Sequence, residues 1–345
     1  MSTANRPVSS NPPFPDEGAV GASPAAYTLM DLGVLPDMAP LLPVALNEQG
    51  DLAAHGFAPP EEPDSWKVYG YVIKDGRRTQ SLIPPGKTPI NGLNVAGLMC
   101  GAARRGYSPL HAWATHLGWF GADFWPDRDS FAIGINASGA VTGQVVASGV
   151  KDRATKRAFL VSPAGQIRLL IPPWGDEVTA AAINDVGTVL LNSLPHAGPG
   201  RGVQTWLWQG GKFQLLENIG GDTWGVALTP GGRVAGHALT PLGERHAVFW
   251  SQGHSYDLNP SQDCESEALA ANDQCVVVGR LLDARGGSQA FRWTPTEGMR
   301  PLAELVPNAG GWVLQKATCL NARGQIAGTG LLEGRRRGFL LTPVE

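Results

Sequence analysis

The sequence has few charged residues and few cysteines, and both shortages narrow what the protein can be. Charged residues are 17% of the 345, and the net charge is −3 at pH 7. We therefore expect no binding to nucleic acid and no attraction to an anionic membrane. The four cysteines form no Cys-x-x-Cys pair and have no histidines at zinc spacing. This predicts free, mostly buried thiols, no metal site and a reducing, cytoplasmic setting.

Long hydrophobic runs are also missing. No stretch approaches the roughly 20 apolar residues of a membrane-spanning helix. The first 25 residues are rich in Pro, Ser, Gly and Ala, and they lack the basic start and apolar segment of a secretory signal. We expect residues 1–25 to be a disordered leader and residues 26–345 to form one domain.

Glycine and proline are abundant, with 45 and 28 residues, and 43% of the chain is hydrophobic. That composition favours a packed domain with many turns and few long helices. The main pattern in the sequence is a nine-residue frame, seen in "INASGAVTG" and "LNARGQIAG", in which an Asn precedes two glycines. Complete and degraded copies recur every 42 to 49 residues, with anchors at Asn47, Asn94, Asn136, Asn184, Thr229, Asn272 and Asn321.

Each frame predicts a tight turn between two antiparallel strands. Asn at the first turn position can accept hydrogen bonds from backbone N–H groups two residues on. The first Gly supplies the positive φ that such a turn needs. Cys275 stands at that Gly position in the sixth copy, where we expect local strain of roughly 1 kcal/mol. The frame residues are therefore interpreted as structural.

Two more strands follow each frame. The third strand combines a small residue with aromatic or aliphatic ones, as in "RAFLV" (157–161) and "HAVFW" (246–250). After a short turn, a more polar fourth strand ends in leucine, as in "IRLL" and "SYDL". Four strands in about 45 residues are typical of a β-propeller blade. The fold class predicted is all-β, a seven-bladed propeller with four antiparallel strands per blade.

The two ends of the sequence indicate how the ring closes. The chain stops after the third strand of the seventh copy, at "RGFLL" (337–341). A fourth-strand pattern occurs instead at the other end, in "AYTLMDLG" (26–33). We therefore predict that the N-terminal strand at 27–33 completes the blade at 313–343. An open solenoid would need polar capping units rather than a displaced strand.

The repeat unit resembles the HAF repeat, which is named for its His-Ala-Phe tripeptide. The resemblance is carried by "A-x-x-I-N-x-x-G-x-V-x-G", by "HAVF" at His246 and "HAW" at His111, and by "D-L" strands, and it covers residues 27–343. That family of bacterial proteins has no assigned role and is often supposed to be extracellular. The resemblance implies a propeller-like fold, and it implies that His111 and His246 occupy structural positions.

One end of the ring should carry the long, variable loops that join the fourth strand to the next first strand and the second strand to the third. Tryptophans and acids gather in these loops. The candidate binding residues are Trp119, Trp125, Asp127, Trp174, Asp176, Glu177, Asp222, Trp224, Asp263, Glu265 and Trp312.

These residues allow three interpretations. The tryptophans can be wedges between blades, a recognition surface for a protein or peptide, or the wall of a small-molecule pocket with acid–base carboxylates. We favour a monomeric, non-catalytic scaffold that engages a protein or peptide partner, possibly a basic one. The alternative is a propeller lyase or hydrolase acting on a small molecule, peptide or sugar over the central channel. No motif predicts a cofactor or a catalytic residue.

Overall fold

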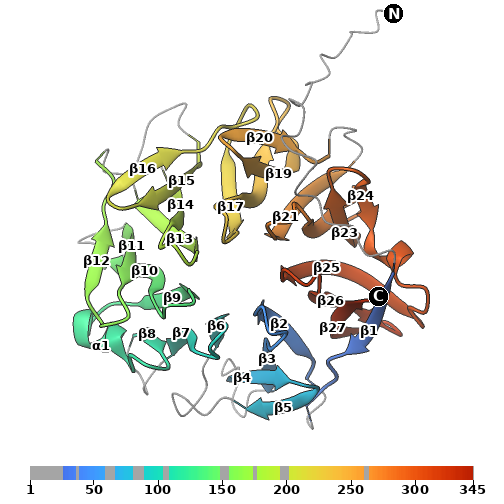
Figure 1. Ribbon diagram of the computed structural model, residues 1–345, viewed down its shortest axis with the longest axis horizontal. Coiled ribbons are helices and arrows are strands. Elements are labelled where there is room, and N and C mark those ends of the chain that lie inside the picture. The colour runs from blue at the N-terminus through green and yellow to red at the C-terminus, as the bar shows by residue number, and fades with distance from the viewer. Residues whose placement is uncertain are drawn as a thin grey trace, which may run out of the picture.

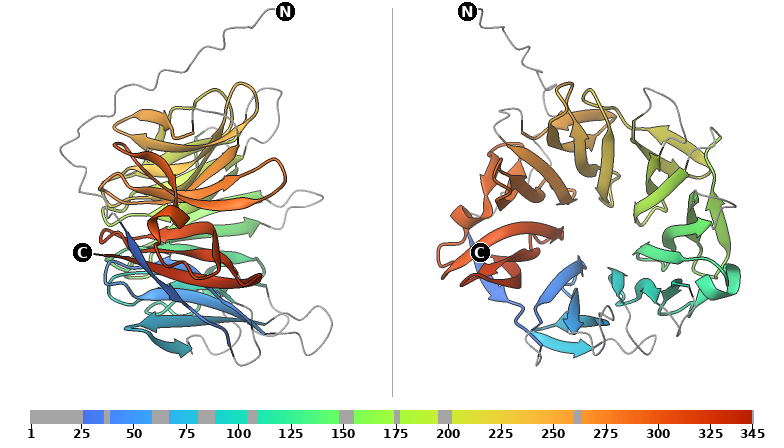
Figure 2. Two further views of the ribbon diagram at one scale, coloured as in Figure 1. Left: turned by 90° about the vertical axis from the view of Figure 1, so that its right-hand side faces the viewer. Right: turned by 180° about the vertical axis from the view of Figure 1, so that it is seen from behind.

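A computed structural model describes residues 26–35, 39–58, 67–80, 89–103, 109–147, 155–173, 177–194, 202–259 and 264–344. Seven antiparallel sheets stand around a central opening, each with its first strand innermost (Figure 1). Figure 2 shows the same ring from its edge and from behind. The predicted seven-bladed propeller is confirmed. The leader at 1–25 lies outside the described residues.

Six of the seven blades have four strands, in the order first to fourth from the centre outward. Blade 1 consists of β2 (Leu41–Leu46), β3 (Leu52–Ala58), β4 (Lys67–Lys74) and β5 (Arg77–Gln80). Blade 3 consists of β9 (Ser130–Ile135), β10 (Val141–Ala147), β11 (Thr155–Val161) and β12 (Ile167–Leu170). Blade 4 consists of β13 (Glu177–Ile183), β14 (Val189–Leu194), β15 (Gln204–Gln209) and β16 (Lys212–Leu215).

The last three blades repeat this order. Blade 5 consists of β17 (Thr223–Leu228), β18 (Val234–Leu239), β19 (Arg245–Ser251) and β20 (His254–Asp257). Blade 6 consists of β21 (Glu265–Ala271), β22 (Val277–Leu282), β23 (Ser288–Thr294) and β24 (Gly298–Pro301), followed by the 3-10 helix η2 (Leu302–Leu305). Blade 7 consists of β25 (Trp312–Leu320), β26 (Ile326–Leu332), β27 (Arg335–Pro343) and β1 (Tyr27–Asp31).

Blade 2 departs from the prediction of four strands. Its described part has three, β6 (Ile90–Leu93), β7 (Met99–Ala103) and β8 (His111–Ala114). The short helix α1 (Phe120–Phe124) lies against β8 where the other blades have a fourth strand (Figure 1). Phe120 is buried and stacks edge-on against Phe159 of blade 3 at 5.9 Å between ring centres. An aromatic side chain on α1 thus joins this blade to the next.

The N-terminal strand closes the ring as predicted. β1 pairs antiparallel with β27, so that Leu29 lies opposite Leu341 and Asp31 opposite Phe339. Tyr27 is buried, and its hydroxyl accepts a 3.5 Å hydrogen bond from the Arg292 guanidinium on blade 6. β1 therefore binds blade 7 along its edge and contacts the preceding blade.

Small residues on second strands allow the strands of one blade to pack closely. A Cβ atom added to Gly279, the second Gly of the sixth frame, would lie 1.9 Å from the Glu267 carbonyl oxygen and 2.9 Å from the Phe291 ring. Phe291 and Phe249 are fully buried in one cluster that joins blades 5 and 6. The second Gly of the frame is thus required by close approach, whereas the first is required by backbone conformation. Cys275 has the predicted positive φ, 59°.

The frame asparagines do more than shape their own turns. Each Oδ1 caps its own turn, as when Asn136 Oδ1 accepts the Ala140 N–H at 2.8 Å. Each Nδ2 donates to a backbone carbonyl of the next blade. These links, which we name the Asn ring, run from Asn47 to Asn94, Asn94 to Asn136, Asn136 to Asn184, Asn184 to Thr229 and Pro230, Asn272 to Asn321, and Asn321 to Asn47.

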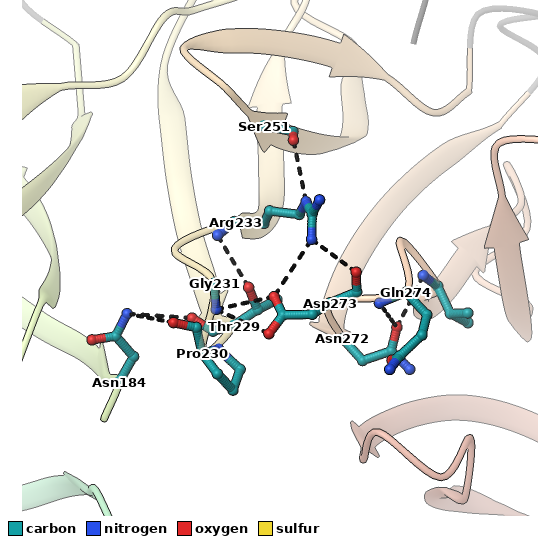
Figure 3. A network of polar contacts seen from close by, with 10 residues as sticks. Asn184, Thr229, Pro230, Gly231, Arg233, Ser251, Asn272, Asp273 and Gln274 are labelled. Atoms are coloured by element: carbon teal, nitrogen blue, oxygen red, sulfur yellow. Dashed lines mark hydrogen bonds and ion pairs between the residues drawn. The ribbon is translucent and has the colours of Figure 1, made fainter. Parts of the chain in front are cut away.

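One joint lacks this link because blade 5 has Thr229 in place of Asn. Arg233 makes the connection instead (Figure 3). Its Nη1 donates to the Asp273 carbonyl at 2.8 Å and lies 3.6 Å from the Asp273 carboxylate. That carboxylate also accepts the Gly231 N–H, at 2.9 Å. A guanidinium and a carboxylate therefore replace one amide.

The Asn ring yields a test of how much its last link stabilises the fold. Asn321 is fully buried, and its Nδ2 donates to Asn47 O at 3.1 Å and to Gln325 Oε1 at 2.8 Å. The change Asn321→Asp keeps the turn-capping oxygen but puts a second oxygen against two acceptors. We expect the free energy of unfolding in urea to fall by about 1–3 kcal/mol or more. Asn308→Asp, at an exposed position, is the control. Equal stability of the two variants would contradict the role of the Nδ2 links.

Candidate functional site

The two ends of the ring differ in their connections. We call the end with the frame turns the turn face, and the opposite end, where first and third strands begin, the loop face. Most of the predicted binding residues that the structure describes belong to the loop-face side of their blades, but Trp119 follows the turn after β8, at the turn face. Trp174, Asp176 and Asp263 lie outside the described residues.

Three of the predicted tryptophans pack into three different apolar clusters. Trp125 lies on Phe159, with ring centres 5.1 Å apart. Trp312 meets Phe339 edge-on at 6.0 Å. Trp119 is partly buried against the cluster between blades 1 and 2. This packing corresponds to the wedge interpretation, and it does not bring the three rings together in one surface.

The remaining predicted residues are more open, and they are also dispersed. Asp127 and Glu265 are exposed, whereas Glu177 and Asp222 are half-buried. Trp224 is 36% exposed and is the cross-strand partner of His237 on blade 5. Of the predicted set, Trp224 therefore lies beside His237 on the two innermost strands of blade 5.

Trp224 stands five residues before its frame anchor, and the same position in the other blades completes a circle on the innermost strands. These residues are Leu42, Pro89, Phe131, Thr179, Trp224, Glu267 and Lys316. The circle is uneven. Blades 1 to 3 supply apolar side chains, and blades 6 and 7 supply opposite charges.

A second circle lies eight residues after each anchor, on the second strands. Its members are His55, Ala102, Gln144, Asn192, His237, Arg280 and Thr329. In six blades the residues of the two circles are cross-strand partners. Some of these side chains are structural. His55, for example, lies 2.7 Å from the Ile90 carbonyl oxygen of the next blade, and Asn192 Nδ2 donates to the Gly225 carbonyl oxygen.

Blades 5 to 7 differ because their side chains form a charged cluster, which we define as His237, Arg245, Glu267, Arg280 and Lys316. The carboxylate of Glu267 is at its centre and only 9% exposed. Arg245 of blade 5 donates to one oxygen at 2.6 Å, and Arg280 donates to the other at 2.7 Å. One buried carboxylate thereby fixes two guanidinium groups from neighbouring blades.

The charged cluster changes the pKa of three of its members. Burial raises the pKa of Glu267, but the hydrogen bonds from Arg280 and Arg245 outweigh it, so the net pKa is below the usual value. Burial lowers the pKa of His237, and the two arginines lower it further against the opposing charge of Glu267. Burial, followed by the charge of Arg280, lowers the pKa of Lys316. The environment therefore favours an ionised Glu267 and neutral forms of His237 and Lys316.

This arrangement is suited to binding an anion and moving a proton. A guanidinium has five N–H donors, and Arg245 and Arg280 each use one on Glu267 while remaining 37% and 29% exposed. Their other donors can bind a carboxylate. Perturbed proton affinities in neighbouring buried groups are common where proton transfer occurs. The charged cluster therefore combines two features expected of a catalytic site, groups that can bind a substrate anion and neighbouring groups with shifted pKa values.

The electrostatic coupling can be measured without a substrate. Glu267→Gln removes the negative charge that favours the imidazolium, so we expect the pKa of His237 to fall further. An NMR titration of the histidine ring signals, with His237→Asn to assign them, gives the shift directly. Glu304→Gln, at an exposed side chain of η2, is the control. An unchanged or higher pKa of His237 in Glu267→Gln would show that the carboxylate does not act on it.

The sequence contained a signal for this cluster that the frame analysis did not use. All seven copies align without gaps from five residues before the anchor to eight after it. Because the blades are architecturally equivalent, a position at which the residue type changes from copy to copy is not set by the repeat alone. Glu267, Lys316, His237 and Arg280 stand at such positions.

No metal centre or membrane segment is found in the described part of the chain. Within residues 26–344, apart from the gaps given above, no group of three or more His, Cys, Asp or Glu side chains is placed to hold a metal ion. The four cysteines are free, and three of them are buried. None of the described helices is long and apolar enough to cross a membrane.

No family model matches this chain, and no curated protein matches it, so the resemblance to the HAF repeat stays a prediction. Solved propellers do match. The β-propeller domain of the Trilobed protease from Pyrococcus furiosus, described as having an open velcro topology, has a TM-score of 0.61 and 10% identity, covering 94% of this chain and 95% of that one. Here, by contrast, β1 closes the ring.

Two further matches are enzymes by name. Oligogalacturonate lyase from Vibrio parahaemolyticus has a TM-score of 0.61 and 10% identity, over 93% of this chain and 98% of that one. Acylaminoacyl peptidase from Pyrococcus horikoshii has a TM-score of 0.59 and 10% identity, over 89% of this chain. This chain spans only 53% of the peptidase chain. At such identities the similarity shows the fold alone.

These matches correct the functional expectation. The names of these propellers, a protease domain, a peptidase and a lyase, count against the non-catalytic scaffold favoured by the sequence. They support the enzymatic alternative. The sequence argument failed because it treated the tryptophans as surface residues that bind a partner. The structure instead packs Trp125, Trp312 and Trp119 into apolar clusters.

Proposed function

We propose that the protein is an acid–base enzyme that acts on a small carboxylated molecule at the charged cluster on blades 5 to 7. The observation that carries the proposal is the buried Glu267 carboxylate, which holds Arg245 and Arg280 beside two groups whose pKa is lowered. This proposal takes up the alternative expected from the sequence, a lyase or hydrolase over the channel, and assigns its reaction to the charged cluster.

Arg245 and Arg280 are proposed to bind the substrate carboxylate. Bidentate binding by guanidinium is favourable for a planar carboxylate. Glu267 is a positioning residue that fixes both arginines and partly neutralises them. The cluster still carries an excess of positive charge, which favours an anionic substrate.

Lys316 is proposed to take the proton. A lysine acts as a base only in its neutral form, which burial and the Arg280 charge favour here. In an elimination, Lys316 would remove the proton next to the bound carboxylate, the resulting electron pair would form a double bond as the β C–O bond breaks, and the leaving oxygen would take a proton from water. The two arginines would stabilise the negative charge that develops on the carboxylate. His237, held neutral, can bind a substrate hydroxyl.

An acidic sugar is the first substrate class to test. It offers a carboxylate, a neighbouring acidic C–H and a C–O bond that can break, and the lyase of the same fold is named for oligogalacturonate. The match to the peptidase covers about half of that protein, and so supports only the scaffold.

The test is a substrate panel with the purified chain. Oligogalacturonates and other uronate oligosaccharides would be followed by the ultraviolet absorbance of the unsaturated product, and neutral oligosaccharides of the same length would be the controls. We expect turnover of a carboxylated substrate only, and loss of that turnover in Arg280→Gln. Equal turnover of neutral sugars, or turnover of none, would contradict the proposal.

We also propose that the chain is a monomeric, cytoplasmic member of the HAF-repeat group. The frame, the tripeptide positions and the composition support this. Fractionation of the native cell and size-exclusion chromatography test the location and the monomer.

A further inference from the structure

Trp224 is a large aromatic residue at the inner edge of the ring that the proposed reaction does not use. It lies on β17, the innermost strand of blade 5, which borders the central opening (Figure 1). Within the described residues, no other tryptophan is as exposed. An exposed indole offers a ligand a large and rigid apolar surface. Trp224 is therefore examined as a binding residue at the mouth of the charged cluster.

The two neighbours of Trp224 in the chain show which way its ring faces. Thr223 Oγ1 accepts the Thr205 N–H of blade 4 at 2.9 Å. A Cβ atom added to Gly225 would lie 2.7 Å from Thr205 Cγ2. Because successive side chains of a strand point to opposite sides, Trp224 faces away from blade 4. It faces the side of blade 6, whose innermost strand β21 adjoins β17 (Figure 1).

The same side of blade 5 carries His237 of the charged cluster. His237 is the cross-strand partner of Trp224, and the Cβ atoms of such partners are about 4.5–5.5 Å apart. The charges of Glu267, Arg245 and Arg280 all act on the pKa of His237. The indole therefore stands at the edge of the charged cluster, where a molecule held by the two arginines would meet it.

We infer that the indole of Trp224 binds the C–H face of a pyranose ring whose carboxylate is held by Arg245 and Arg280. The face of an aromatic ring carries partial negative charge. The C–H bonds of a sugar ring are polarised by the neighbouring oxygens, so a flat group of them carries partial positive charge and fits that face. An acyclic acid has no such flat group. This specificity rests on the proposed function for the position of the carboxylate, and it makes Trp224 the residue that selects cyclic over acyclic acids.

Isothermal titration calorimetry with D-galacturonate and D-glycerate as probes tests this role. Both probes carry one carboxylate and hydroxyl groups, but only galacturonate has a pyranose ring. We expect the wild-type chain to bind galacturonate more tightly than glycerate. Trp224→Leu should weaken galacturonate binding by about 5- to 10-fold and leave glycerate binding unchanged. Trp224→Phe, which keeps an aromatic face, should retain part of the difference. Leu215→Ala, at an exposed side chain of the outermost strand β16, is the control.

A variant of Arg280 separates this specificity from the proposed function. Arg280→Gln should weaken the binding of both probes, because both use the carboxylate site. If it does so while Trp224→Leu binds galacturonate as the wild type does, the role of Trp224 is overturned and the carboxylate site stands. Galacturonate binding that is unaffected by Arg280→Gln, or no binding of either probe, would overturn the carboxylate site and with it the placement of the pyranose.

An NMR measurement on the wild-type chain keeps the role of Trp224 testable if Trp224→Leu fails to fold. The indole N–H signal of Trp224, assigned with Trp224→Phe, should shift when galacturonate is added and shift much less with glycerate. A signal that does not move with galacturonate would overturn the contact. In the substrate panel, Trp224→Leu should raise KM with little change in kcat, since the contact is made equally in the bound substrate and in the transition state.

Discussion

A chain that lacks residues 1–34 is expected not to form a stable folded monomer. Without β1, the edge of β27 loses its ladder, and Phe339 and Leu341, both fully buried, lose their cover. Burial of Tyr27 and Leu32 alone contributes about 3–6 kcal/mol, at 1.5–3 for each large side chain. That is comparable with the whole stability of many domains, ~5–15 kcal/mol. Circular dichroism and thermal unfolding of the truncated chain measure the loss.

A shorter truncation separates the strand from the leader. Removing residues 1–24 keeps Ala26, whose carbonyl accepts the Val344 N–H, and all of β1. We expect this variant to unfold at the wild-type temperature. A synthetic peptide of residues 26–35, added to the longer truncation, should restore folding by pairing with β27. Wild-type stability of the chain without β1 would show that the ring does not depend on this closure.

Replacing Lys316 is expected to have the largest effect on turnover of the substrate that the panel identifies. Removal of a general base lowers the rate by about 10²- to 10⁴-fold. Lys316→Met should show this loss in kcat. Lys316→Arg keeps a long basic side chain that is permanently charged and cannot be deprotonated, so it should lose kcat to a similar extent while KM changes little.

The pH profile gives an independent measure of the same role. The base must be neutral, so kcat should rise with pH through the pKa of Lys316, which burial and Arg280 place below its usual 10.5. That rising limb should disappear in Lys316→Arg. A Lys316→Arg enzyme with wild-type kcat and pH profile would show that Lys316 acts only as a cation.

The repeat pattern predicted the fold because its physical causes are local. A turn that needs Asn and Gly, a small residue after it and an aromatic third strand are all visible within one period. Counting the frames gives seven blades, and the displaced fourth strand predicts the pairing of β1 with β27. The local pattern could not predict α1, because "FGADF" lies in a stretch that reads as a loop.

The charged cluster and the Asn ring could not be predicted in the same way because both connect different blades. The turn-capping hydrogen bond of Oδ1 is enough to account for an asparagine in each turn. The sequence therefore gives no reason to expect that its Nδ2 also bonds to the neighbouring blade. Glu267, Arg245 and Lys316 come from three blades, and each is an ordinary polar residue within its own copy. The tryptophans led to a wrong interpretation because large aromatic residues in loops are typical of binding surfaces. Trp312 and Trp125 instead pack against apolar clusters of the core.

The joint between blades 5 and 6 should respond to ionic strength, unlike its six counterparts. There the neutral amide link is replaced by Arg233 and Asp273, which are 22% and 34% exposed. Dissolved ions screen such a pair, whereas they hardly affect the buried Asn amides. In concentrated salt the ring therefore has one seam that loosens first, and the charged cluster has members on the blades at either side of it.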